Sequence, residues 1–270
     1  MCAFLLLFTA SIKSFFVFSE YSQAIMGLFY IFLLKITRVI SDKTSMTKRI
    51  IIAAILMLLW AARGLFAQGL DGVYQIELEG MNKEPIARGT GFGIRSYYSQ
   101  SEYILTSFHL LNARLVEAGA LRVKKANGEI EYLKIAAYDE LNDILLLSKN
   151  DVAGESFYLT SKCENGLNVA GFYKERMLVM DAKNFIPTDI YGVKKLPVYL
   201  NKGFSGAPVF NNGALVCGMV VLSSEMNANS VAVSSVLLNE LIKKYESGER
   251  KFYSVRDVKR ELGVENISQN

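Results

Sequence analysis

A single serine stands between two glycines in the stretch Gly203-Phe204-Ser205-Gly206-Ala207-Pro208-Val209. Glycines on both sides of Ser205 allow a tight turn that projects its hydroxyl and lets another molecule approach the backbone closely. The amides of Gly203 and Ser205 could then point into one concavity and stabilise a developing oxyanion. An ordinary turn between two strands is the simpler interpretation, and this stretch alone does not decide between the two.

The only histidine of the chain, His109, ends the apolar run Tyr103-Ile104-Leu105-Thr106-Ser107-Phe108. Taken alone, a histidine there is most simply a half-buried structural residue. An imidazole is also the base that activates a serine hydroxyl, provided that a carboxylate holds its tautomer. His109 is therefore the one imidazole available to Ser205.

Asp143 is the candidate carboxylate. It directly precedes the apolar run Ile144-Leu145-Leu146-Leu147, so it will be partly buried if that run forms a strand. A buried carboxylate needs a partner, and an imidazole N–H is one. Two alternatives stay open: Asp143 as a solvated turn residue, and the neighbouring Asp139, which lies in a more polar stretch and is expected to be exposed.

His109, Asp143 and Ser205 follow one another in the order that chymotrypsin-like enzymes use, and over about residues 85–245 the chain resembles that family, the trypsin-like serine peptidases. Leu105-Thr106-Ser107-Phe108-His109 resembles the family's Leu-Thr-Ala-Ala-His run, and Asn142-Asp143-Ile144-Leu145-Leu146 resembles its Asp-Leu-Ala-Leu-Leu run. The Ser205 stretch is similar to Gly-Asn/Asp-Ser-Gly-Gly-Pro. Gly89-Thr90-Gly91-Phe92-Gly93-Ile94 looks like the glycine-rich strand that precedes the family's histidine.

The resemblance implies an all-β fold: two packed antiparallel six-stranded β-barrels, chymotrypsin-like, with a C-terminal α-helix. It also implies His109 as general base, Asp143 as the residue that orients it and Ser205 as nucleophile, with the amides of Gly203 and Ser205 as oxyanion hole. The site would lie in the cleft between the barrels. The chain looks most like the bacterial branch that includes the glutamyl endopeptidases and the HtrA/Deg protease domain.

Short alternating or apolar runs between turn signals favour an all-β protein independently of the resemblance. They predict strands at residues 73–78, 91–95, 103–107, 121–125, 130–136, 144–147, 167–172, 177–180, 196–200, 207–210, 214–222 and 230–233, with tight turns at Asn127-Gly128 and Asn212-Gly213. Ser235 is expected to cap a helix that ends at Gly248. Its apolar face would be Val236, Leu237, Leu238, Leu241 and Ile242. A second, solvated helix is predicted after Ser254.

Several residues depart from the family pattern. Phe204 replaces the polar residue that usually precedes the nucleophile, and its bulk could distort the oxyanion hole. Tyr199 stands six residues before Ser205, where trypsin-type enzymes carry an acid, so cleavage after basic residues is not expected. Lys202 near the rim hints at acidic or polar substrates. Val221 and Leu222 are predicted to help form the wall of the substrate pocket.

The composition excludes several classes of protein. With 51% hydrophobic and 21% charged residues in 270, the chain is not disordered. The net charge of +4 divides into +5 for residues 1–67 and −1 for the rest. The body therefore lacks the excess positive charge that is typical of nucleic-acid-binding proteins. No metal site is predicted, and the predicted chemistry needs no cofactor.

The N-terminal 67 residues are predicted to be separate from the folded body. Residues 46–67 read as a signal peptide, with a basic start followed by an apolar run, and residues 1–45 as a hydrophobic extension that precedes the true start. The alternatives are an uncleaved membrane anchor at residues 50–66 and a membrane hairpin that begins at Met1. The body then divides into a first barrel (68–150), a second barrel with the helix (151–247) and a polar tail (248–270).

Cys163 and Cys217 are the only cysteines after residue 67. In an oxidising compartment they could form a disulfide, although Cys217 lies in an apolar run that suits a buried thiol equally well.

The leading hypothesis is an exported serine endopeptidase, periplasmic or secreted, that acts on protein or peptide substrates. The alternative is a trypsin-fold binding or scaffold protein without turnover, which the bulk of Phe204 motivates. The oligomeric state and the preferred side chain of the substrate stay open at this point.

Overall fold

The computed structural model describes residues 70–124, 130–149, 152, 154–163, 166–211, 215–224, 229–248 and 253–264. These belong to the second of the two compact units into which the chain divides, Phe66–Asn270. The predicted signal peptide, the extension before it and both predicted Asn-Gly turns lie outside the described residues. Within the described ranges, no helix combines the length and apolar character that a membrane crossing needs.

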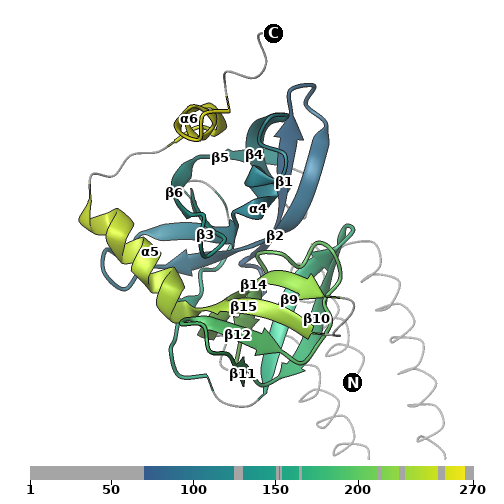
Figure 1. The fold of residues 1–270 in the computed structure, drawn as a ribbon, viewed down its shortest axis with the longest axis vertical. Helices are drawn as coiled ribbons and strands as arrows, with labels where there is room; N and C mark the ends of the chain where they lie inside the picture. Colours follow the sequence, from purple (N-terminus) through teal and green to yellow (C-terminus); the bar gives the residue numbers. More distant parts are fainter. Residues whose placement is uncertain are drawn as a thin grey trace, which may run out of the picture. The chain divides into compact units, whose positions relative to one another are not determined.

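The first sheet is a curled antiparallel sheet in the order β5-β4-β1-β2-β3-β7-β6. Its members are β1 (Val73–Gly80), β2 (Pro85–Arg95), β3 (Glu102–Ser107), β4 (Ala118–Lys124), β5 (Ile130–Leu133), β6 (Ile135–Asp139) and β7 (Ile144–Ser148). The two outermost members, β5 and β6, are separated along the chain only by Lys134. The sheet therefore curls until its edges share one bent strand, which gives a six-stranded barrel (Figure 1).

The second sheet repeats this plan in the order β10-β9-β13-β14-β15-β12-β11, with β8 (Tyr158–Leu159) parallel to β14. Its members are β9 (Leu167–Tyr173), β10 (Arg176–Lys183), β11 (Ile186–Pro187), β12 (Val193–Leu196), β13 (Pro208–Phe210), β14 (Leu215–Ser224) and β15 (Asn229–Ser234). Only two residues separate β10 from β11, so this sheet also closes through one bent strand.

The observed strands overlap every predicted one, but the strand at residues 196–200 is placed wrongly. The strand β12 ends at Leu196, because Pro197 has no N–H to donate to a neighbouring strand.

Strand β1 is buried on both faces, although its alternating sequence predicts a half-buried strand. Ile76 and Leu78 point into the first barrel's core. On the other face, Gln75 donates to the Lys174 carbonyl in the β9–β10 turn (2.7 Å), and Glu77 pairs with Arg122. The second barrel's hairpin therefore covers the polar face of β1.

The two barrels share one hydrophobic cluster. It includes Phe92 and Leu105 from the first barrel and Met219 and Val233 from the second. The helix α5 (Ser235–Ser247) contributes its apolar face and contacts β14, β15 and β6, as Figure 1 shows. The predicted helix is confirmed, but its N-cap is Ser234, whose backbone is still extended, and Val236 of the predicted apolar face is exposed. The Ser235 hydroxyl donates to the Thr160 carbonyl (2.6 Å).

The predicted polar tail is wrong for residues 253–264. Tyr253 pairs with Ile135 of the first barrel, and the helix α6 (Val255–Glu261) buries Val255 and Val258 in that barrel's core. A reciprocal capping box between Ser254 and Asp257 begins the helix. The second helix is therefore packed on one face and not solvated all round.

Candidate active site

Strand pairing brings His109 and Asp143 together. Strands β3 and β7 are antiparallel neighbours, with Ser107 opposite Ile144. The residues just after Ser107 and just before Ile144 therefore lie side by side, and the Phe108 amide donates to the Asp143 carbonyl (3.2 Å). His109 begins the short helix α4 (His109–Asn112) at this edge.

The Asp143 carboxylate contacts His109 at two points. His109 Nδ1 lies 2.6 Å from Asp143 Oδ2, and the His109 backbone amide donates to Asp143 Oδ1, also at 2.6 Å. Because a carboxylate accepts hydrogen bonds, the ring hydrogen belongs on Nδ1, which leaves Nε2 as the free acceptor of the neutral ring. The His109 side chain is 45% exposed, so its outer edge is open to another molecule.

Asp139 has a different role from Asp143. Its carboxylate accepts from the backbone amide of Asn142 (3.1 Å) and from the Asn142 side chain (2.7 Å), which shapes the turn before β7. Asp143 closes that turn with a left-handed φ of 55°, a conformation that aspartate tolerates better than most residues. Of the two carboxylates, Asp143 contacts His109 and Asp139 contacts Asn142.

The segment before Ser205 forms a type II turn. The Phe204 amide donates to the Asn201 carbonyl (3.2 Å), and Gly203 stands at the third turn position with φ 104°. A Cβ at Gly203 would collide with the Phe172 carbonyl, so only glycine fits. Among the described residues, no group accepts from the amides of Gly203 or Ser205, so both donors remain available.

Thr90 joins the serine loop to the first barrel. Its amide donates to the Ser205 carbonyl (2.8 Å), and its hydroxyl donates to the Gly203 carbonyl (2.6 Å) while accepting from the Phe172 amide (2.9 Å). Thr90 is fully buried. The sequence indicates the glycine-rich strand but does not single out Thr90. The only signal was a hydroxyl residue between two glycines.

Close approach of the backbones explains Gly206. A Cβ there would collide with the Thr90 carbonyl, and Gly206 has φ 84°. The Gly206 amide donates to the Val220 carbonyl (2.8 Å), which also accepts from the buried Ser107 hydroxyl (3.2 Å). Ser107 lies two residues before His109, so these contacts hold the Ser205 loop beside the His109–Asp143 pair.

The Phe204 side chain lies in the core of the second barrel and is fully buried. Gly171 makes room for the ring, because a Cβ there would come within 2.5 Å of it. The expectation that the bulk of Phe204 distorts the oxyanion hole is therefore not supported by the position of its ring.

The predicted pocket residues differ in exposure. Tyr199 is half-buried, Lys202 is exposed, Val221 is buried and Leu222 is 60% exposed. The segment around Tyr199 is held by the Ser230 hydroxyl, which donates to the Val198 carbonyl (2.8 Å) and accepts from the Leu200 amide (3.2 Å). That these four residues form a substrate pocket stays a prediction.

In the part of the chain that the structure describes, no hydrogen bond joins Ser205 to His109, and no three His, Cys, Asp or Glu side chains gather as metal ligands. The groups available for chemistry at this site are therefore the oriented imidazole of His109, the Ser205 hydroxyl and the free amides of Gly203 and Ser205.

Cys163 and Cys217 form a disulfide, with their Cα atoms 5.8 Å apart. It joins the segment after β8 to β14 within the second barrel. Of the two alternatives that the sequence leaves open for these cysteines, the structure contains the disulfide.

Comparison with solved structures finds serine proteases. The active form of the Rv3671c protease from M. tuberculosis matches with a TM-score of 0.55 and 16% identity, over 69% of this chain and 86% of that chain. A serine-to-alanine mutant of Rv3671c in its inactive form gives 0.53 and 16%, over 69% and 92%. The serine endoprotease from Yersinia pestis gives 0.57 and 19%, over 68% of each chain.

No protein-family model and no curated sequence matches the chain. At these identities the solved structures establish the fold alone, and the predicted class of two antiparallel barrels is confirmed. The assignment to the glutamyl endopeptidase and HtrA/Deg branch stays a prediction.

Proposed function

We propose that this chain, which has the chymotrypsin-like double-barrel fold of trypsin-like serine proteases, is an exported serine endopeptidase. Ser205 attacks the peptide carbonyl, His109 takes the hydroxyl proton and returns it to the leaving amine, and water then hydrolyses the acyl-enzyme. Asp143 holds His109 throughout. The contact of both Asp143 oxygens with His109 is the observation that carries this proposal.

The two contacts from Asp143 support a specific task for His109. An imidazole acts as base only when its free nitrogen faces the nucleophile and the other nitrogen is held as N–H. The Nδ1 contact sets the tautomer, and the backbone contact fixes the position of the same residue. This leaves Nε2, on the exposed edge of the ring, to accept the Ser205 proton.

The free amides of Gly203 and Ser205 support a second task, stabilisation of the oxyanion. Each preorganised donor of this kind contributes about 3 kcal/mol to stabilisation of the transition state. The type II turn sets the direction of the Gly203 amide, and the hydrogen bond from Thr90 to the Gly203 carbonyl holds that glycine in the turn.

Export is supported by two separate features. Residues 46–67 have the charge and apolar pattern of a signal peptide. The Cys163–Cys217 disulfide is of a kind that persists in oxidising compartments. Protein or peptide substrates would approach the exposed side chains of Lys202 and Leu222.

The test is labelling with a fluorophosphonate probe, which reacts with an activated serine. We expect labelling of the purified full-length chain and none of Ser205→Ala. A Ser223→Ala variant, which changes another serine of the second barrel, is the control and should label normally. Equal labelling of the wild type and Ser205→Ala would contradict the proposal.

The alternative, a binding or scaffold protein without turnover, is favoured by one observation: the structure contains no hydrogen bond between Ser205 and His109. Such bonds often tighten only when substrate is bound, so we rank catalysis first. An unlabelled protein that still binds peptides would support the alternative.

A further inference from the structure

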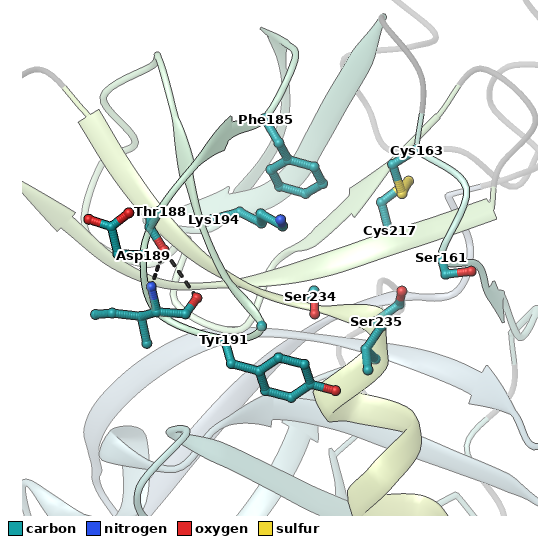
Figure 2. A pocket seen from close by; sticks show the side chains of 13 residues that line it. Ser161, Cys163, Phe185, Thr188, Asp189, Tyr191, Lys194, Cys217, Ser234 and Ser235 are labelled. Carbon is teal, nitrogen blue, oxygen red and sulfur yellow. Dashed lines mark hydrogen bonds between the residues drawn. A yellow bond between two sulfur atoms is a disulfide. The ribbon is translucent and has the colours of Figure 1, made fainter.

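A cavity of about 450 Å³ lies in the second barrel and is separate from the candidate active site. Its wall includes the β11–β12 turn, Lys194 of β12, the Cys163–Cys217 disulfide and the start of α5. Figure 2 shows Lys194 extending across the cavity, with its ammonium between the Phe185 ring and Ser234. None of His109, Asp143 or Ser205 lines it.

Two polar side chains in this cavity have no partner within the described part of the chain. The Ser234 hydroxyl is buried, with 8% of the residue exposed, and makes no hydrogen bond. Lys194 is half-buried and forms no ion pair with any described carboxylate. A buried hydroxyl without a partner costs free energy, so a ligand that accepts from Ser234 would remove that cost.

The first turn of α5 adds backbone donors. Ser234 is the N-cap, yet its side chain makes no capping bond, and no acidic residue lies in the first turn. The Ser234 amide donates to the Gly192 carbonyl (2.7 Å). In the described ranges, no group outside the helix accepts from the amides of the following three residues, 235–237. A helix start in this state carries about half a positive charge and favours an anion.

One part of the cavity wall is apolar. Ile190, Tyr191 and Val236 are all large, exposed apolar residues, and all three line it. Tyr191 is held in place by a hydrogen bond from its hydroxyl to Glu240 (3.0 Å). Phe185 and the disulfide continue this apolar lining.

We propose that this cavity binds a carboxylate carried on an apolar or aromatic group. The carboxylate would accept from Lys194 Nζ, the Ser234 hydroxyl and the first amides of α5, and the apolar group would cover Ile190 and Tyr191. A single negative charge matches one lysine and one helix start better than a dianion, because the exposed Asp189 also lies at this cavity. This site does not depend on catalysis by Ser205.

The test compares N-acetyl-phenylalanine with its uncharged amide on the full-length chain. An amine-modifying reagent is added, and the modification of each lysine is followed by mass spectrometry. We expect the acid to slow modification of Lys194 and the amide to have little effect. Lys202, on the candidate active-site loop, is the internal reference for binding at that site. Equal effects of acid and amide, or protection of Lys202 alone, would overturn the proposal.

Variants locate the carboxylate within the cavity. Ser234→Ala should weaken binding of N-acetyl-phenylalanine about tenfold, with an unchanged thermal unfolding midpoint because the side chain makes no capping bond. Lys194→Met, measured by calorimetry, should weaken it at least as much. The matched control is Asp189→Asn, which should bind equally or more tightly. Weaker binding to Asp189→Asn, with full binding to Ser234→Ala, would contradict the assignment.

An acetylated hexapeptide ending in phenylalanine distinguishes two sources of the same chemistry. Protection of Lys194 by both the peptide and the single residue indicates a site for polypeptide C-termini. Protection by the single residue alone indicates a site for small organic acids. Either result supports the carboxylate site, and protection by neither would overturn it.

Discussion

Thr90 shows how one buried hydroxyl can support a site without reacting. Replacing Thr90 by Val keeps the shape of the side chain but leaves the Gly203 carbonyl without its donor and the Phe172 amide without its acceptor. Leaving these two buried backbone groups without hydrogen-bond partners costs about 1–3 kcal/mol. We therefore expect fluorophosphonate labelling of Thr90→Val to slow by about 10- to 100-fold. Thr90→Ser keeps the hydroxyl and should label nearly as fast as the wild type.

The labelling rate must be read beside folding. If Thr90→Val and Thr90→Ser have similar unfolding midpoints and only the Val variant labels slowly, Thr90 is a positioning residue for the loop. Equal rates for the two variants would show that the hydroxyl has no such role.

Asp143 and Asp139 provide a matched pair of carboxylates four residues apart. Asp143→Asn replaces the acceptor beside His109 Nδ1 by an amide and permits the wrong tautomer. If the proposed function holds, peptide hydrolysis should fall by about 10⁴-fold, the loss that the same substitution causes in a Ser-His-Asp triad. Asp139→Asn changes only the turn contacts to Asn142 and should reduce the rate by less than about tenfold.

At the residue scale, the sequence predicts the candidate catalytic residues more readily than the residues that hold them in position. His109, Asp143 and Ser205 carry recognisable chemistry, and their order in the chain narrows the choice. Thr90 and Ser107 act through hydrogen bonds to backbone carbonyls more than 100 residues away in the sequence. No local pattern reports such a contact, because its partner depends on how the two barrels pack.

At the element scale, strands β2 and β3 are joined by a pair that responds to pH. The Arg95 side chain donates to Glu102, and together with Lys149 it holds the pKa of Glu102 below its ordinary value, against the effect of burial. A carboxyl whose folded pKa is lowered stabilises the fold above its unfolded pKa of about 4.3, and this contribution is lost as the pH falls through the folded pKa.

Glu102→Gln should therefore lower the free energy of unfolding at pH 7, and the difference from the wild type should shrink below about pH 4. Urea unfolding across that pH range measures it. The control is Glu117→Gln, which breaks an exposed pair with Arg114 and should change little at any pH. If the difference in unfolding free energy between Glu102→Gln and the wild type stays constant from pH 7 to below about pH 4, the destabilisation does not come from the ionisation of Glu102.

The sequence predicts whether a segment forms a strand or a helix where its hydrophobic periodicity is strong. It does not predict which faces of that strand or helix are buried. The alternation in β1 indicates a strand, but the cover on its polar face comes from Lys174, about 100 residues later. Likewise, only Val255 and Val258 mark a buried face on α6, and two apolar residues are too few to distinguish a packed helix from a solvated one.

At the scale of the whole molecule, the candidate site exists only where the barrels meet. His109 and Asp143 belong to the first barrel and Ser205 to the second. Their alignment depends on the shared cluster of Phe92, Leu105 and Met219 and on the hydrogen bonds from Thr90 and Ser107. A change that loosens the second barrel should therefore reduce activity as well as stability.

The disulfide tests this coupling. Cys163 and Cys217 are 54 residues apart in sequence, and closing a loop of that length stabilises a fold by about 4 kcal/mol on a chain-entropy estimate. The double variant Cys163→Ala, Cys217→Ala should lose about 2–4 kcal/mol of unfolding free energy. Reduction of the wild type should reproduce that loss, and adding reductant to the variant should change nothing. Because the Ser205 loop belongs to the same barrel, fluorophosphonate labelling of the double variant should fall at denaturant concentrations that the oxidised wild type tolerates. An unchanged unfolding curve for the double variant would contradict a stabilising role for the disulfide.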